Sequence, residues 1–232
     1  DAAWVSGLGA DALAGVGFFT PIFMILVGFG NGLGAGAAFA ISKYIGEENK
    51  PKADNASVHS ILLDVILSII ITIVLLVLLI PILNAMGVGQ TIGYATDYGN
   101  IIVLGSIFII LSNALYGIYR GEGDSKRPMY AMMASAILNM ILDPILIYHL
   151  NLGVKGAAIA TLISAVFVIL ILFYWFYIKR DTYLKPIFAN FNFKKDISWD
   201  IVKVGIPASI QLLNNAFFAA VFSALLAFLS ST

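Results

Sequence analysis

The sequence predicts an all-α protein, a polytopic bundle of transmembrane helices, and three observations support this fold class. Hydrophobic residues make up 60% of the 232 residues and charged residues 11%, whereas soluble domains are nearer ~45–50% apolar and ~25% charged. Several charge-free stretches are long enough for a spanning helix, which needs ~20 largely apolar residues. No stretch alternates with a period of two over the length of a strand, so a β-barrel is not indicated.

Turns placed at glycine, proline and charge clusters divide the chain into six expected spans. They cover residues 12–43, 57–83, 94–119, 128–149, 153–178 and 204–230. The chain begins at Asp1 rather than at a methionine, so we expect it to be part of a longer protein.

The basic residues predict the orientation of these spans. Twelve of the 13 lysines and arginines fall in or beside alternate loops, 43–56, 120–127 and 181–203, and only Lys155 falls in the others. By the positive-inside rule the three basic loops are cytoplasmic. We therefore expect a multi-pass protein of the cell membrane.

Residues 181–203 differ from the other loops because they are long and mix aromatic side chains with lysines. That composition is typical of a segment that lies on the membrane surface. We interpret it as a linker between two lobes. Residues 1–180 would then form an N-terminal lobe that lacks its first helix, and 204–232 would form the first helix of a second lobe.

Composition and motifs exclude several function classes. The net charge of zero argues against a nucleic-acid partner, and a chain without cysteine has neither disulfides nor thiolate metal sites. There is no nucleotide-binding glycine motif, so ATP is not indicated and no cofactor is expected. Gly121-Glu122-Gly123-Asp124 matches the GxGD motif of intramembrane aspartyl proteases, but the Tyr-Asp dipeptide of their second helix does not occur here. We therefore do not expect this protein to be an enzyme.

Asp143 is the most informative single residue. It lies about 22 Å into its helix, in the outer half of a hydrocarbon core that is ~30 Å thick. An acid at such a depth is a functional candidate by default, and it would bind H⁺ or, with Asn139, Na⁺. Asn139 lies on the same helical face, and Pro144 frees the carbonyl of Met140. The alternative is a structural acid satisfied by neighbouring helices, or a helix that ends at Pro144.

Other polar residues give weaker predictions. Asp64 lies near the expected start of its helix, where it can reach the cytoplasmic interface, and we interpret it as structural. Tyr98 and Thr161 are expected near the level of Asp143. Tyr98 begins a polar stripe along 94–119, which indicates a cavity or a partner helix and continues through Gly105, Ser112, Asn113 and Tyr116. Hydrogen bonds between helices are the alternative for each of them.

The first expected helix is rich in glycine. Gly28, Gly32 and Gly36 share one face, a spacing that lets helices pack closely. Pro21, upstream on the same helix, and Pro144 are the expected positions of helix bending.

Several stretches together resemble the multidrug and toxic compound extrusion family, especially its prokaryotic and archaeal members. They are residues 1–23, 117–124 and 138–144, followed by the spaced Gly153, Gly156 and Thr161. The resemblance covers essentially the whole chain. It implies a protein of twelve helices in two six-helix lobes, of which this chain holds helices two to six and the first helix of the second lobe.

The resemblance also implies a function and a site. Family members exchange cations inward for drugs outward, so we expect a monomeric antiporter of small organic cations, coupled to H⁺ rather than Na⁺. The residues carried over to a hydrogen-bonded cation site are Asp1, Tyr98, Asn139, Asp143 and Thr161, with Asn113 nearby. Met132 would contact substrate in the lobe cavity, as would Tyr116, where relatives often have asparagine.

Two alternatives stay open. A related lipid-linked sugar flippase would carry basic residues in its cavity for a pyrophosphate head group, whereas all thirteen basic residues here are expected in loops. A receptor or scaffold that transports nothing would need no buried acid.

Overall fold

The computed structural model describes residues 1–185, 188 and 191–230, and from 216 onward it describes only the path of the helix. The described residues form helices and no strand, which confirms the all-α prediction. The order is α1 (Ala2–Val5), α2 (Ala10–Gly46), α3 (Lys50–Ala85), α4 (Ile92–Leu104), α5 (Ser106–Gly121), α6 (Lys126–Pro144), α7 (Val154–Phe173) and α8 (Lys195–Ser230). Short π-helical segments, Ile145–His149 and Tyr174–Lys179, continue α6 and α7.

Among the described residues, four helices are long and apolar enough to cross a membrane, and α4 with α5 would make a fifth span if this bent pair is counted as one. These are the first five spans expected from the sequence. The sixth, 204–230, lies within α8, whose side chains from 216 onward are outside the described residues, so that span stays a prediction.

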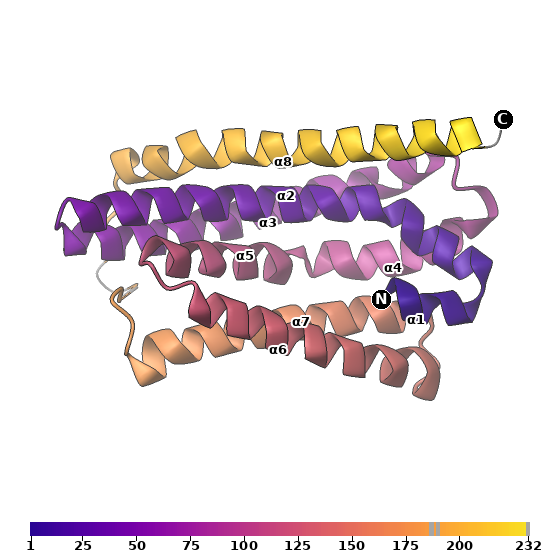
Figure 1. Ribbon diagram of the computed structural model, residues 1–232, viewed down its shortest axis with the longest axis horizontal. Helices are drawn as coiled ribbons and strands as arrows, with labels where there is room; N and C mark the ends of the chain where they lie inside the picture. The colour runs from indigo at the N-terminus through magenta and orange to yellow at the C-terminus, as the bar shows by residue number, and fades with distance from the viewer. Residues whose placement is uncertain (186–187, 189–190, 231–232) are drawn as a thin grey trace.

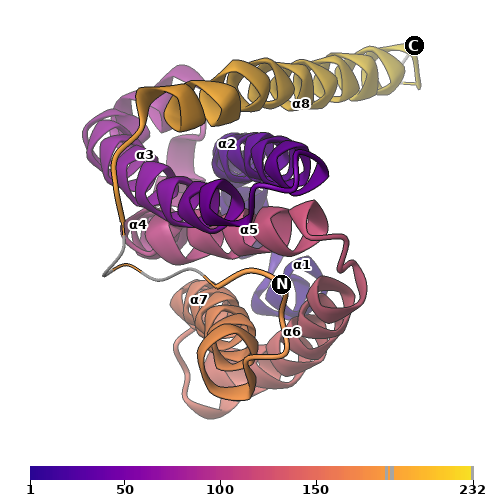
Figure 2. The ribbon, with the colours of Figure 1, turned by 90° about the vertical axis from the view of Figure 1, so that its left-hand side faces the viewer.

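The long helices run roughly along the longest axis of the molecule (Figure 1). Viewed from one end, α8 lies on one side with α2 and α3, while α6 and α7 lie on the other, with α4 and α5 between them (Figure 2). Buried apolar side chains form two clusters along this axis. One surrounds Phe19 and Ile102 near the N-terminal half of α2, and the other surrounds Ile41 and Leu115 near its C-terminal half.

Glycines let α2 touch two helices on opposite faces. A Cβ on Gly32 or Gly36 would lie 1.9 Å from Ser209 Oγ or 2.1 Å from the Ile201 carbonyl oxygen, both of α8. On the other face, a Cβ on Gly34 would lie 2.7 Å from the Asn113 carbonyl oxygen of α5. The expected packing role of the glycine run is confirmed, because only residues without a side chain permit this approach.

The expected single helix 94–119 is wrong. The chain bends by 52° between α4 and α5, with Gly105 at the break. A Cβ at Gly105 would lie 2.3 Å from the Leu162 side chain of α7. On the other side the Thr72 hydroxyl of α3 lies 2.6 Å from the Ser106 hydroxyl and 3.4 Å from the Val103 carbonyl oxygen. Tertiary contacts therefore occupy both sides of the break, and the local sequence alone did not indicate it.

Helix α3 begins at Lys50 rather than at the expected 57. The Asn49 side chain accepts a hydrogen bond from the Lys52 amide at 3.2 Å, and Pro51 lies in the first turn. Both features are typical of a helix start. This places Asp64 ~21 Å along the helix axis, with 1% of its surface exposed, so the expectation that it reaches the interface is wrong.

The three loops expected to be cytoplasmic lie at the same end of the bundle, at the left of Figure 1. Residues of the linker bind residues of both other loops: the Lys185 amide donates to Asp54, the Leu184 amide donates to Glu122, and Arg127 forms an ion pair with Asp181. Burial raises the pKa of Glu122, and the hydrogen bond from Leu184 opposes this shift. The shared end agrees with the charge pattern, whereas the direction of insertion stays a prediction.

The described part of the linker crosses this end of the bundle without spanning it. Figure 2 shows it running from α7 to α8. It is shorter than expected, because α8 begins at Lys195 and takes in Trp199 and Lys203, which had been assigned to the linker. Residues 186–187 and 189–190 of the expected linker lie outside the described residues. The division into two lobes stays a prediction.

Candidate functional site

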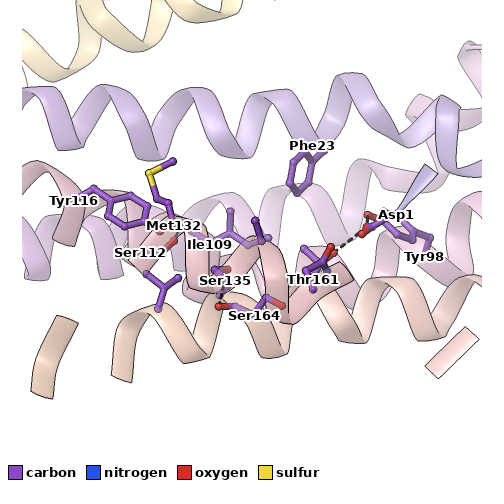
Figure 3. Close-up of a pocket in the computed structure, with 14 residues that line it drawn as sticks. Asp1, Phe23, Tyr98, Ile109, Ser112, Tyr116, Met132, Ser135, Thr161 and Ser164 are labelled. Atoms are coloured by element: carbon purple, nitrogen blue, oxygen red, sulfur yellow. Dashed lines mark hydrogen bonds between the residues drawn. The ribbon is translucent and has the colours of Figure 1, made fainter. Parts of the chain in front are cut away.

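Asp1 is the centre of a small hydrogen-bonded cluster. Its Oδ2 accepts a hydrogen bond from the Tyr98 hydroxyl of α4 at 2.8 Å and another from the Thr161 hydroxyl of α7 at 2.9 Å. Figure 3 shows the three side chains converging at one end of a pocket. Two donors on one oxygen favour the ionised carboxylate. Three of the expected site residues are thus brought together from positions far apart in the sequence.

Asp143 lies next to this cluster and is fully buried. One of its oxygens lies 3.2 Å from the backbone nitrogen of Asp1. As the first residue of this chain Asp1 carries an ammonium group there, whereas in a longer chain the same atom would belong to an amide. The Asp143 oxygens accept no hydrogen bond from any described side chain. Asp143 is therefore a buried acid in contact with Asp1 and short of donors.

A cavity of ≈ 420 Å³ opens beside the cluster (Figure 3). Asp1, Tyr98 and Thr161 lie at one end, and Tyr116 and Met132 lie at the other. The described residues that line it include one acid and no base; the remainder are Phe23, Ile109, Ser112, Ser135, Ala136, Asn139, Ser164, Ala165 and Val168. An acid together with aromatic faces and a thioether provides a suitable surface for an organic cation.

Asn139 lines this cavity, but the hydrogen bond expected between Asn139 and Asp143 is not formed among the described residues. The two side chains share a helical face, yet Asp143 is buried behind the lining while Asn139 faces the cavity. A spacing of four residues allows such a contact on a helix without requiring it. Asn139 is positioned to meet a ligand rather than to hold the acid.

Asn113 does not join the cluster. Its amide donates to the Ile109 carbonyl of its own helix at 2.8 Å, and Asn113 lines a second cavity of ≈ 610 Å³ closer to the end of the bundle where the three basic loops lie. Tyr116 and Met132 line both cavities. Asn113 therefore lies one cavity away from Asp1.

Arg120 also lines the second cavity, from the last turn of α5. The expectation that every basic residue lies in a loop is therefore wrong. Helix α5 runs on to Gly121, which turns the guanidinium toward the space shared with Asn31 and Met133.

The two prolines behave differently. Pro21 lies inside α2, which continues through it as one helix, although Figure 1 shows the first turns of α2 inclined to the rest. Pro144 is the last residue of α6, and the π-helical segment Ile145–His149 follows directly. The helix type therefore changes directly after Pro144, while the expected bending at this residue stays a prediction.

Sequence reasoning missed Phe23, Ser135 and Ser164 as cavity residues. Ser164 follows Thr161 by three residues and shares its face, so helical spacing could have found it. Ser135 donates to the Ser164 carbonyl at 3.1 Å. Nothing in the local pattern around Phe23 separated it from the other apolar residues of α2.

The GxGD motif has a structural explanation. Asp124 Oδ1 accepts hydrogen bonds from the Lys126 and Arg127 amides at the start of α6, and its other oxygen lies 2.8 Å from the Arg127 guanidinium. The acid therefore satisfies the free amides at a helix N-terminus.

Comparisons with known proteins agree with this fold. The MatE family model matches residues 1–145. The chain is 33% identical over 221 residues to the multidrug export protein MepA of Staphylococcus aureus, covering 93% of this chain and 48% of that protein. It is 27% identical to the probable multidrug resistance protein YoeA of Bacillus subtilis, covering 89% and 46%. The chain thus spans about half the length of the curated relatives it matches.

Solved structures give the same result. An inward-facing multidrug resistance MATE family transporter of the MOP superfamily superposes with a TM-score of 0.88 at 43% identity, over 91% of this chain and 48% of that one. An outward-facing one gives 0.88 at 42% identity, over 94% and 49%. The chain belongs to the MatE family, the multidrug and toxic compound extrusion transporters.

Proposed function

We propose that the full-length protein is a cation-coupled antiporter that exports small organic cations across the cell membrane, with Asp1 and Asp143 as the coupling acids. The observation that carries this proposal is a cavity whose described lining holds Asp1 and no base, with Asp143 buried beside Asp1. The names of the relatives, multidrug export proteins, support the substrate class. The protein is expected to act as a monomer.

Coupling would rest on competition between a proton and other partners of the acids. Asp1 keeps two hydroxyl donors in the arrangement described here, which favour its charged form. Asp143 is buried, which favours its neutral form. A proton would therefore bind Asp143 before Asp1, and its arrival would reduce the negative charge beside the cavity and weaken the attraction for a cationic drug. This logic favours H⁺ over Na⁺, because Asn139 does not face Asp143 as a sodium site at that pair would require.

The direct test is gradient-driven efflux by the full-length protein in proteoliposomes. Asp143→Asn keeps the size of the side chain and removes its titration, so we expect efflux to fall to background while the protein still folds. Driving the same vesicles with a pH gradient or a sodium gradient separates the two coupling ions. Wild-type efflux by Asp143→Asn would refute the assignment.

Asp97→Asn is the matched control. Asp97 lies on α4, half-exposed, with one oxygen 3.3 Å from the Lys155 ammonium, and exposed pairs of this kind are worth ~0–1 kcal/mol. Efflux should therefore stay near the wild-type rate. If both variants lose activity equally, the loss comes from general damage to the protein and the coupling assignment fails.

A second candidate is movement of a lipid-linked sugar with a pyrophosphate head group, and Arg120 is the observation that favours it. The guanidinium lines the ≈ 610 Å³ cavity with Asn31 and Asn113, and arginine suits phosphate recognition. A family structure from Pyrococcus furiosus, 42% identical, is described as having a binding pocket of reverse polarity that suggests a different function. Arg120→Gln should abolish flipping if this candidate is right, and should leave export of organic cations intact if it is wrong.

A further inference from the structure

Asp64 is a buried acid that the proposed mechanism does not use. It lies on α3 with 1% of its surface exposed. Both carboxyl oxygens are buried, and neither has a hydrogen-bond partner in the part of the chain that the structure describes. Asp1 and Asp143 lie in a separate cluster on α1, α4, α6 and α7, so Asp64 belongs to a different place in the fold.

A line of hydroxyl groups shares the face of Asp64. Ser60 and Ser68, four residues to either side, are fully buried, as is Ser57 one turn further toward the cytoplasmic end. The Ser57 and Ser60 hydroxyls donate to the Asp54 and Ala56 carbonyls of α3 itself, which leaves their oxygens free to accept. These hydroxyls therefore lie between Asp64 and the end of α3 where the linker crosses.

No charged partner compensates a negative charge on Asp64. Among the described residues, no charged group of the helices that pack against α3 interacts with Asp64. On α3 itself, the His59 ring nitrogens lie at the Asn55 carbonyl and the Lys194 amide. The other titratable and charged groups described on α2, α3, α4, α5 and α8 are Asp11, Lys43, Tyr44, Lys50, Lys52, Asp54, Tyr94, Asp97, Tyr98, Tyr116, Tyr119, Arg120, Lys195, Asp196, Asp200 and Lys203.

An ionised carboxylate without donors or counter-charge is very unfavourable in a protein interior. A protonated carboxyl costs far less there, because it carries no net charge. We propose that Asp64 is a second proton-binding site, separate from Asp143, which holds a proton in this packing and exchanges it with cytoplasmic water along the line of Ser60 and Ser57. On release, the O–H bond of the carboxyl breaks and the proton passes to water at the cytoplasmic end. The inference does not depend on the proposed antiport.

Infrared difference spectroscopy of the full-length protein in lipid tests this directly. A protonated buried carboxyl gives its own C=O stretching band, which shifts in heavy water. We expect one such band to disappear as the pH is raised, to be lost in Asp64→Asn and to persist in Asp143→Asn. The measurement needs neither drug nor ion gradient. Its outcome for Asp64 is therefore independent of the outcome of the transport assay of Asp143→Asn.

Two further variants keep the result interpretable. Asp64→Glu keeps the acid and should shift the band, which identifies Asp64 even if Asp64→Asn folds poorly. Asp54→Asn removes an acid of the same helix that is already paired with Lys50 and should leave the band in place. Ser60→Ala should slow the shift of the band after transfer to heavy water, because it interrupts the line of hydroxyls.

Three outcomes would overturn the proposal. The first is a set of carboxyl bands that neither Asp64→Asn nor Asp64→Glu changes. The second is a band that belongs to Asp64 but stays constant over the whole pH range in which the protein remains folded, since that identifies a permanently protonated structural acid. An unchanged exchange rate in Ser60→Ala would reject the cytoplasmic route.

Discussion

The acids at the two ends of the bundle are buried to a similar degree but differ in what surrounds them. Asp200, near the start of α8, has 6% of its surface exposed, and Asp143, beside the Asp1 cluster, has none. Asp200 accepts from the Lys43 ammonium at 2.6 Å, the Tyr44 hydroxyl at 2.8 Å and the Lys203 ammonium at 2.5 Å. Among the described residues, Asp143 has only the backbone nitrogen of Asp1, at 3.2 Å.

Their ionisation should differ accordingly. Burial alone would raise the pKa of Asp200, but the hydrogen bonds from Lys203, Lys43 and Tyr44 outweigh it and hold the pKa well below its usual range. Such an acid stays ionised and works as a fixed clamp between α2 and α8. An acid that exchanges protons needs fewer donors than this. Burial alone therefore does not separate a fixed structural acid from one that can exchange a proton.

The largest expected effect concerns which side of the membrane each end faces. This chain contributes no cysteine, so single cysteines can be placed in it once any cysteine elsewhere in the full-length protein has been replaced by serine. Lys52→Cys and Lys185→Cys should react with a membrane-impermeant reagent only in inverted vesicles, and Lys155→Cys only in intact cells. Labelling of position 52 from outside intact cells would show that the predicted orientation is reversed.

The next effect is on stability. Asp200→Ala removes three hydrogen bonds to one buried acid and leaves two lysines without their partner. Hydrogen bonds to charged groups are worth ~1.5–3 kcal/mol each in favourable cases, and partial exposure of both lysines reduces this, so we expect a loss of about 2 kcal/mol. Thermal unfolding of the full-length protein in detergent measures it, with Asp97→Ala as the exposed control.

Lowering the pH should remove the stabilisation by Asp200 without a mutation. Because the pKa of Asp200 is lower in the folded protein than its unfolded value of about 3.9, its contribution is fully present above that value. It is lost as the pH falls toward the folded pKa. The stability difference between wild type and Asp200→Asn should thus be constant near neutral pH and shrink below about pH 4. A stability difference that grows in acid would contradict the stabilising role of the ionised Asp200.

The smallest effect is expected on the pH dependence of efflux, from changes in the hydrogen-bonded cluster around Asp1. Tyr98→Phe removes one of the two hydroxyl donors to Asp1 and keeps the ring that packs edge-on against Phe19. A hydrogen bond to a charged acceptor is worth ~1.5 kcal/mol, so the proton concentration at half-maximal efflux should change by about tenfold. Thr161→Ser should keep the wild-type value and Thr161→Val should match Tyr98→Phe. An unchanged pH profile in both would remove Asp1 from the coupling site.

The sequence predicted the bundle, most of its spans and the residues around Asp1, and it failed where tertiary contacts decide. Tyr98 and Thr161 were assigned through the family resemblance, and they meet Asp1 as expected. The bend at Gly105 was missed because Leu162 and Thr72, distant in sequence, act on it. The early start of α3 was missed because the charged residues after Lys50 were taken for a loop, although Asn49 and Pro51 are typical of a helix start.

The contacts of α2 also have a consequence for how this chain can vary. Any side chain at Gly32, Gly34 or Gly36 would meet backbone or Ser209 at less than 2.8 Å, and backbone cannot move aside as a flexible side chain can. Gly17 and Gly46, on the same helix, have open space around the position of a Cβ, and alanine there would favour the helix. Among these glycines, substitution should therefore be tolerated at Gly17 and Gly46, toward the ends of α2, and not at Gly32, Gly34 or Gly36 in its middle.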